Sequence, residues 1–231
     1  MRMLMKVLIG NLIIVNYAIA EIKVSAVTAT ASTEICKVVM TQAYEAIGEQ
    51  VKFIDLPGVT SIQYADEGKT DAELFRISGV DKKYKNLIQV PIAINYINAT
   101  VLSTNDAIEI GSWKDLAPYR IGIRRGVLFS TNNTEGMNTF EADTSEQLLK
   151  MLEAGRLDVV VLTESNALLN LKTYPYKNVK IIASVQKIPL FHYIHVSKSH
   201  LLSSLSEQLY IMKESGEIEN ARINYLNKFL K

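Results

Sequence analysis

The chain has 231 residues, of which 25 are lysine or arginine and 24 are aspartate or glutamate, so its formal net charge at neutral pH is +1. A balance this close to neutrality argues against nucleic acid or an anionic membrane as the main partner. The length is sufficient for one domain or two lobes with a real hydrophobic core, and the single cysteine, Cys36, excludes an intramolecular disulfide.

Residues 1–20 have the three-part pattern of a cleavable secretory signal peptide. A basic start at Arg2 and Lys6 precedes an apolar run, and Ala18-Ile19-Ala20 fits the cleavage site. A membrane anchor is the alternative, but the apolar run is shorter than the roughly 20 residues that span a bilayer. We therefore expect a periplasmic protein whose mature chain begins at Glu21 and, without the two basic residues of the leader, has a net charge of −1.

The mature chain alternates short β-type runs with helical stretches, which is typical of α/β folds with mostly parallel sheets. The first half predicts strands at 21–27, 51–56 and 69–77, helices at 32–47 and 61–67, and one long extended stretch in which 86–91 continues into 92–103. Ser32 is the expected cap of the first helix. Cys36 falls on the apolar face of that helix, where a buried small hydrophobe is favoured over a free reactive thiol.

The second half continues the alternation up to two C-terminal helices. It predicts strands at 119–124, 139–142, 158–162 and 179–185, helices from about 130, at 145–154, 165–171, 203–215 and 217–230, and an extended stretch at 190–196. Thr144 and Gln147 form a capping pattern before the helix at 145–154. The unbroken β-branched run at 158–162 indicates a strand that is buried on both faces.

The extended stretches near 92–103 and 188–196 bracket a region that has its own strands and helices. We interpret this region as an inserted lobe, joined to its neighbour by two hinge strands with a cleft between the lobes. The predicted division is 21–95 plus 192–231 for the first lobe and 96–191 for the second. The absence of repeats and of Pro/Gly/Ser-rich linkers favours hinged lobes over tethered ones.

Patterns that carry catalysis are scarce. His192 and His195 are three residues apart in an extended stretch and so point to opposite faces, which is a poor arrangement for a shared metal, and with His200 they are expected to serve in surface or hinge packing. No phosphate loop, G-x-G-x-x-G, G-x-S-x-G, C-x-x-C or H-E-x-x-H motif is present. We expect no cofactor, no metal and no enzymatic activity.

Several polar residues instead lie at strand ends, where open α/β sheets bind ligands. Arg76 interrupts an apolar run, so its guanidinium either extends to water or reaches a carboxylate of a ligand or partner. Arg124 lies where the strand at 119–124 ends, just ahead of a helix start near Ser130, and arginine with helix amides forms an anion site. Exposed arginines are also common at strand ends without any ligand.

Three segments in order resemble the bacterial extracellular solute-binding proteins of family 3, the polar amino-acid type. They are GKTDAELFRISGVDKKYKNLIQVPIAI at 68–94, IGIRRGVLFS at 121–130 and SEQLLKMLEAGRLDVVVL at 145–162. The resemblance covers essentially the whole mature chain. It implies a two-lobed periplasmic-binding fold that closes on a small solute and delivers it to a membrane transporter.

The chain departs from the family pattern at positions that bind ligand. The arginine that follows "T-P-E-R" in the family has no counterpart, and Arg76 is the nearest replacement. Val127 replaces the threonine of "G-T", and Thr163 occupies the place of the acidic residue, with Glu164 one position later. These differences argue against an ordinary α-amino acid as the solute.

The predicted site therefore combines Arg76 and Arg124 for an anionic group, Thr28 and Ser130 as polar contacts, Tyr96 as a stacking contact and Glu164 for a cationic or hydroxyl group. The expected partners are the solute and an ABC transporter permease, with the protein as a monomer. Two alternatives stay open: an exported sensor that reports its ligand to a membrane receptor, and a periplasmic enzyme such as a dehydratase. The absence of a paired carboxylate disfavours the enzyme.

Overall fold

A computed structural model describes residues 21–28 and 30–230. The predicted signal peptide at 1–20 lies outside these ranges. Within them, no helix is both long and apolar enough to cross a membrane.

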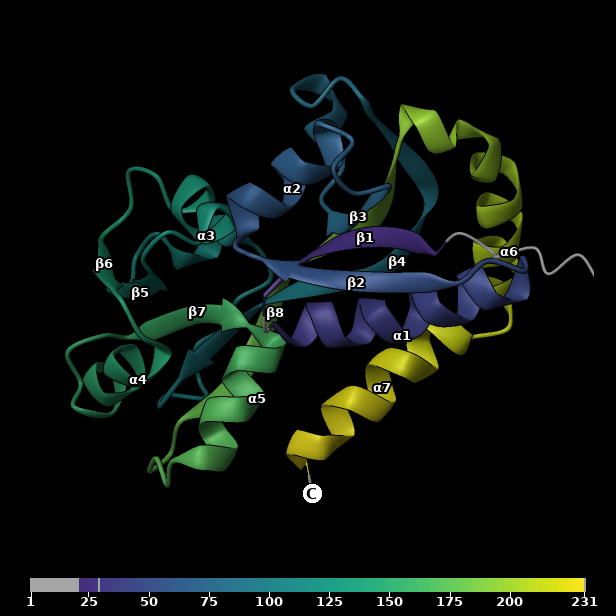
Figure 1. The fold of residues 1–231 in the computed structure, drawn as a ribbon. Helices are drawn as coiled ribbons and strands as arrows, with labels where there is room; N and C mark the ends of the chain where they lie inside the picture. The colour runs from purple at the N-terminus through teal and green to yellow at the C-terminus, as the bar shows by residue number, and fades with distance from the viewer. Residues whose placement is uncertain (1–20, 29, 231) are drawn as a thin grey trace, which may run out of the picture.

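Strands and helices alternate along most of the chain (Figure 1). In chain order they are β1 (Ile22–Val27), α1 (Ala31–Ala46), β2 (Val51–Leu56), α2 (Gly58–Asp66), β3 (Ala72–Arg76), β4 (Leu87–Ser103), β5 (Ile121–Arg124), α3 (Leu128–Asn133), β6 (Thr139–Ala142), α4 (Ser145–Glu153), β7 (Val159–Thr163), α5 (Glu164–Thr173), β8 (Lys180–His195), α6 (Leu202–Glu214) and α7 (Glu217–Leu230). Short 3-10 helices lie at Val80–Lys82, Trp113–Leu116 and Val196–Leu201.

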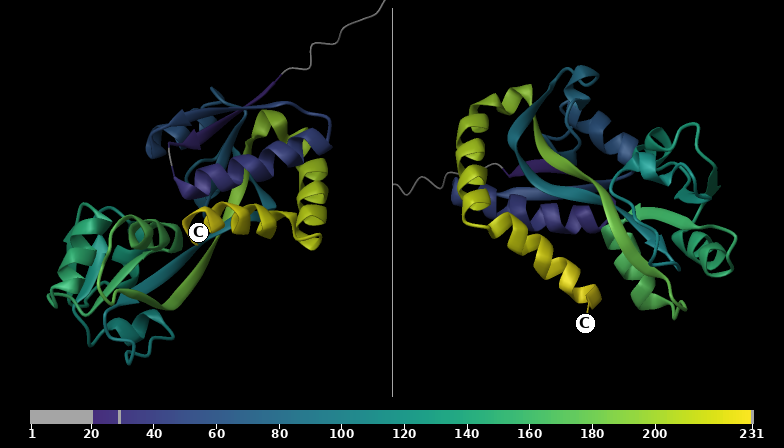
Figure 2. Two further views of the ribbon diagram at one scale, coloured as in Figure 1. Left: turned by 90° about the horizontal axis from the view of Figure 1, so that it is seen from below. Right: turned by 180° about the vertical axis from the view of Figure 1, so that it is seen from behind.

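All the strands belong to one sheet in the order β2-β1-β3-β8-β4-β7-β5-β6. The two long central strands, β4 and β8, pair antiparallel from Leu87 opposite His195 to Ser103 opposite Lys180. Both run from one lobe into the other (Figure 2). Outside them the strands of each lobe pair parallel, β2-β1-β3 in the first lobe and β7-β5-β6 in the second. The predicted two-lobed α/β fold with two connecting strands is thus confirmed.

One connecting strand is longer than the sequence predicted, because the stretches expected at 179–185 and 190–196 are one strand, β8. The long extended stretch predicted from 86 to 103 is confirmed as the single strand β4. Pro91 fits inside β4 because the pairing with β8 is irregular between Gln89 and Ala93. The missing N–H of the proline therefore removes no regular hydrogen bond between the two strands.

Each lobe has its own hydrophobic core. In the first lobe, α1 and α6 pack on a sheet face through residues that include Val39, Leu74 and Leu205. In the second lobe, β7 is buried on both faces, since Val160 packs in a core with α4 and Val161 in a core with β5. This confirms the prediction made from the run at 158–162. Cys36 is fully buried in the first core, as expected.

The predicted cap of α1 is wrong. The helix begins at Ala31, and Thr30 caps it by accepting a hydrogen bond from the Thr33 amide at 3.0 Å. Ser32 lies inside the first turn. The sequence misplaced the cap because threonine and serine are both good capping residues and stand two positions apart.

Candidate functional site

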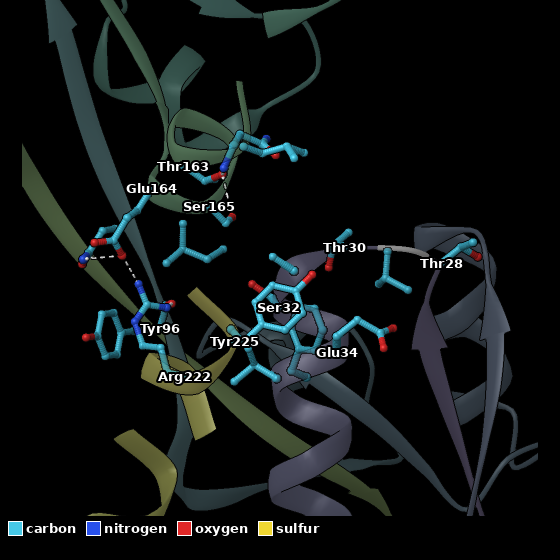
Figure 3. Close-up of a pocket in the computed structure, with 18 of the residues that line it drawn as sticks. Thr28, Thr30, Ser32, Glu34, Tyr96, Thr163, Glu164, Ser165, Arg222 and Tyr225 are labelled. Atoms are coloured by element: carbon cyan, nitrogen blue, oxygen red, sulfur yellow. Dashed lines mark hydrogen bonds and ion pairs between the residues drawn. The ribbon is translucent and has the colours of Figure 1, made fainter. Parts of the chain in front are cut away.

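A cleft of about 770 Å³ separates the two lobes. The end of β1, the start of α1 and the end of β3 form its wall in the first lobe. The end of β5 and the start of α5 form its wall in the second lobe, while the middle of β4 and one face of α7 close it from the sides (Figure 3). The cleft therefore lies where strands end and helices begin, as in other open α/β sheets.

Five of the six residues predicted for the site line this cleft: Thr28, Arg76, Tyr96, Arg124 and Glu164. Ser130 does not. It lies inside α3, which begins two residues earlier than predicted, and its side chain is 1% exposed. Because the helix starts earlier, Ser130 faces the interior instead of the helix entrance.

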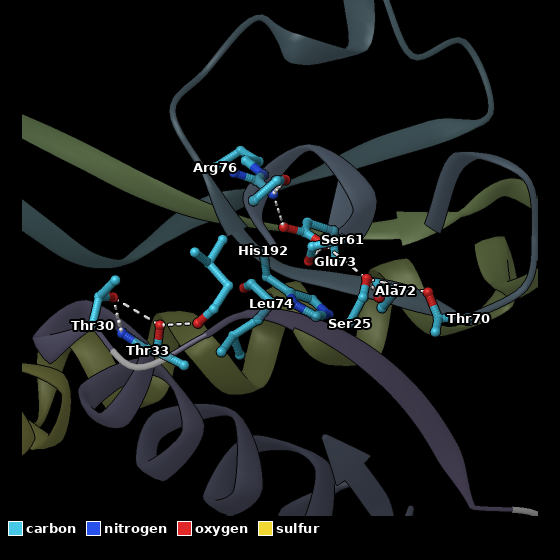
Figure 4. A network of polar contacts seen from close by, with 12 residues as sticks. Ser25, Thr30, Thr33, Ser61, Thr70, Ala72, Glu73, Leu74, Arg76 and His192 are labelled. Atoms are coloured by element: carbon cyan, nitrogen blue, oxygen red, sulfur yellow. Dashed lines mark hydrogen bonds and ion pairs between the residues drawn. The ribbon is translucent and has the colours of Figure 1, made fainter. Parts of the chain in front are cut away.

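Arg76 is held by groups inside the first lobe. One nitrogen of its guanidinium lies 2.6 Å from Glu73 Oε1 and donates to the Gly58 carbonyl at 2.6 Å. Glu73 is fully buried and also accepts hydrogen bonds from the hydroxyls of Ser25 and Ser61 (Figure 4). Burial raises the pKa of the Glu73 carboxyl, and Arg76 with the two hydroxyls acts in the opposite direction.

Glu164 is paired as well. Its carboxylate contacts the guanidinium of Arg222, a residue of α7 that is almost fully buried, and accepts a hydrogen bond from the Asn98 amide at 3.1 Å. The other terminal nitrogen of Arg222 donates to the Tyr96 carbonyl at 2.9 Å. The guanidinium also lies over the Tyr96 ring, 3.9 Å from its centre.

No local sequence pattern distinguishes Arg222 from the other charged residues of its helix. It stands in the middle of an amphipathic helix among ordinary polar residues, and its partner Glu164 is 58 positions away. Only the packing of α7 beside the cleft brings the two together. A buried arginine that is paired across elements cannot be distinguished from an exposed one by periodicity alone.

Arg124 differs from the other two arginines. Its Nε donates to the Asp143 carbonyl at 3.3 Å, and among the described residues no carboxylate forms an ion pair with it. Its neighbour Arg125 points elsewhere and pairs with Asp143 at 2.8 Å and Glu141 at 3.5 Å. The turn that separates the strand from α3 places Gly126 at a φ of +76°, a conformation that favours glycine.

Hydroxyl groups and two helix entrances complete the cleft. Thr30 and Thr163 are the caps of α1 and α5, and Ser32 and Ser165 lie in the first turns of these helices. Glu34, also in the first turn of α1, is the acidic residue on this wall. Helix entrances and hydroxyls can bind an anionic or polar group. Across the described ranges, no cluster of histidine, cysteine and carboxylate side chains has the composition of a metal site.

No family model matches the sequence. Over 191 residues it is 22% identical to an uncharacterized protein of Shewanella oneidensis, an alignment that covers 79% of this chain and 72% of the relative. The solved structures it resembles include the YckB protein of Bacillus subtilis, with a TM-score of 0.72, 19% identity and coverage of 90% of this chain and 91% of the other.

Two further similar structures are a substrate-binding domain and a sensor domain. Substrate binding domain 2 of Lactococcus lactis GlnP, in its open conformation, has a TM-score of 0.65 at 15% identity, covering 89% of this chain and 95% of that domain. A histidine kinase sensor domain with similarity to periplasmic binding proteins has a TM-score of 0.63 at 16% identity, and the match covers 89% of this chain and 96% of that domain. At these identities the likeness establishes the fold. It is the two-lobed fold of periplasmic binding proteins of type 2, as the family 3 resemblance implied.

Proposed function

We propose that this chain is an exported solute-binding protein that captures a small anionic or amino-acid-like solute in the cleft between its lobes and delivers it to a membrane transporter. The observation that carries the proposal is the cationic side chain of Arg124 in an interlobe cleft rich in hydroxyl groups. The fold is shared with a substrate-binding domain of GlnP, which supports the same role.

The charges of the cleft favour a solute with one negative group. Arg76 is compensated by Glu73 and Arg222 by Glu164, whereas Arg124 has no carboxylate partner in the described part of the chain. An anion at Arg124 would gain charge-assisted hydrogen bonds without displacing a protein carboxylate. Glu34 on the other wall could then accept a hydrogen bond from an ammonium or hydroxyl group of the same solute. In this arrangement Thr28 is a polar contact and Tyr96 lines the side of the site that β4 forms.

Capture would proceed by rotation of the lobes about β4 and β8. We place the lobe boundaries at 95/96 and 191/192, which assigns 21–95 and 192–231 to the first lobe and 96–191 to the second. Ile94 and Ile194 belong to the core of the first lobe and Leu102 to a core of the second, which supports this division. Closure by hinge motion between two such bodies is a common response to ligand.

The test begins with native mass spectrometry of the protein as purified, because clefts of this kind can retain their solute. A thermal-shift screen of amino acids, small carboxylates and peptides follows, and the best compound is titrated by calorimetry. We expect Arg124→Ala to weaken binding roughly tenfold or more, the loss of one charge-assisted contact. Arg125→Ala is the matched control, because its guanidinium is engaged outside the cleft, and it should change the affinity less than about twofold. Unchanged affinity in Arg124→Ala and Arg76→Ala would refute the site.

A sensing role is the second candidate, since the fold is also that of a histidine kinase sensor domain. Such a protein would use the same cleft but pass its ligand-bound state to a membrane receptor. Co-purification from membranes would separate the two roles, with a transporter permease expected for capture and a signalling protein for sensing. In both cases export rests on residues 1–20, and N-terminal sequencing of the periplasmic protein should begin at Glu21. We expect this protein to be a monomer.

A further inference from the structure

The C-terminal helix α7 contacts both lobes. It packs against α1 of the first lobe and against α5 of the second. Both views in Figure 2 show it running from the first lobe toward the second. The lobes are therefore linked by α7 as well as by the two strands β4 and β8.

The link is formed by a cluster around Arg222, which we name the hinge clamp and define as Tyr96, Glu164, Lys187, Glu219 and Arg222. Arg222, from α7, holds Glu164 at the first position of α5. Tyr96, from β4, lies under the Arg222 guanidinium, and its hydroxyl donates to Glu219 of α7 at 3.0 Å. Lys187, from β8, lies 3.6 Å from the centre of the same ring. Both connecting strands and one helix from each side of the cleft thus meet at one point.

The Arg222–Glu164 pair is partly shielded from water, because its guanidinium is buried and its carboxylate is half-buried. The side chain of Arg222 is 7% exposed and that of Glu164 is 30% exposed. Breaking a buried pair leaves an uncompensated charge, so such pairs resist separation far more than exposed ones do. A second contact lies further along α7, where Lys172 Nζ of α5 donates to the Lys228 carbonyl at 2.6 Å.

We propose that the hinge clamp fixes the resting angle between the lobes, because Glu164 moves with the second lobe while Arg222 lies on α7, which packs on α1, and donates to Asn95 Oδ1 of the first lobe at 3.2 Å. A hydrogen-bonded ion pair is broken when its two side chains move apart by several ångströms. Rotation of the lobes about the hinge therefore has to break or rebuild the Arg222–Glu164 contact. The clamp then holds the cleft at its present width in the solute-free protein and opposes closure. Its bearing on solute capture rests on the function proposed above, whereas the clamp itself is testable without any solute.

The experiment measures the distance between the lobes in the solute-free protein. Nitroxide labels are attached at Glu45→Cys on α1 and Gln147→Cys on α4, both exposed, and Cys36 stays unlabelled because it is buried. Pulsed electron resonance gives the distribution of label distances. Glu164→Gln keeps the size of the side chain and removes its charge. In this variant we expect the fraction of molecules with a label distance outside the wild-type peak to rise roughly tenfold. Arg222→Met should have at least the same effect, because it also removes the contacts with Tyr96. Adding Glu164→Gln to Arg222→Met should change nothing further, because the contact between the two residues is already lost.

Glu141→Gln is the matched control. It makes the same substitution in an ion pair that lies wholly inside the second lobe, with Arg125, and should leave the distribution unchanged. A wild-type distribution in folded Glu164→Gln would overturn the proposal, as would an equal change in the control. If Arg222→Met does not fold, Glu164→Gln still decides the question. Failure to find any solute would count against the proposed function and leave this result intact.

Discussion

His192 shows how burial constrains the protonation of one side chain. His192 stands on β8, and its fully buried imidazole lies beside Leu74, with Nδ1 3.1 Å from the Leu74 carbonyl (Figure 4). Its Nε2 lies 2.9 Å from the Tyr44 hydroxyl. A carbonyl can only accept, so Nδ1 carries the proton and Nε2 accepts from Tyr44. Burial lowers the pKa of His192 to about 4 and raises the pKa of Tyr44, which keeps the imidazole neutral and the hydroxyl a donor.

This pKa predicts a pH dependence of stability. Between about pH 6.5, the ordinary value for histidine, and about pH 4, the unfolded chain binds a proton that the folded protein does not. The free energy of unfolding should therefore fall by roughly 3 kcal/mol as the pH falls through this window. Urea denaturation at several pH values measures the slope. Glu73, with its raised pKa, contributes a slope of the opposite sign.

The variant His192→Gln separates the contribution of the histidine to the pH dependence of stability from the contribution of Glu73. The variant should lose most of the dependence between pH 4 and 6.5, whereas His200→Gln, at an exposed position, should keep it. An unchanged slope in His192→Gln would show that this imidazole is not the group that titrates.

At the scale of the element, the start of α1 couples the fold to the cleft. Thr30 caps the helix, and the Thr33 hydroxyl donates to the Val27 carbonyl at 2.6 Å, which ties the helix to the end of β1. The same turn presents Thr30 and Ser32 to the cleft. A change at this turn therefore affects both the stability of the helix and the shape of the first wall.

We expect Thr30→Ala to lower the free energy of unfolding by about 1 kcal/mol, because the Thr33 amide loses its acceptor. Ser32→Ala should cost less than about 0.5 kcal/mol, since position 32 is inside the helix, where alanine is favoured. Chemical denaturation of both variants measures the difference. Equal costs at the two positions would restore Ser32 as a cap.

At the scale of the whole molecule, a solute that contacts both walls should stabilise the complete fold. At 100 times its dissociation constant, a ligand adds about 2.7 kcal/mol, which for a chain of this size raises Tm by roughly 5 to 10 °C. Calorimetry of the protein with the best compound from the screen measures the shift. With the roughly tenfold weaker binding expected for Arg124→Ala, this variant should keep only about half of the shift at the same concentration, and Arg125→Ala should keep all of it. A shift of equal size in Arg124→Ala would place the anion elsewhere in the cleft.

The sequence by itself determined the alternation of strands and helices, the doubly buried strand β7, the enclosed Cys36 and the two-lobed plan. These follow from hydrophobic periodicity and from motif order, which are local properties of the chain. It also located five residues of the cleft, because the ends of strands and the starts of helices can be predicted from local patterns. The predicted signal peptide depends on the same kind of local pattern.

Only the tertiary structure decided which charges of the cleft are compensated. Arg76 and Glu164 both line the cleft, but the charge of Arg76 is paired to the buried Glu73 and that of Glu164 to Arg222. Ser130 is buried inside the second lobe. Whether a charge is free depends on partners that are distant in sequence and on the exclusion of water, and neither leaves a periodic signal. For that reason Arg222 escaped prediction, and Arg124 is distinguished from its neighbours only once the lobes are folded.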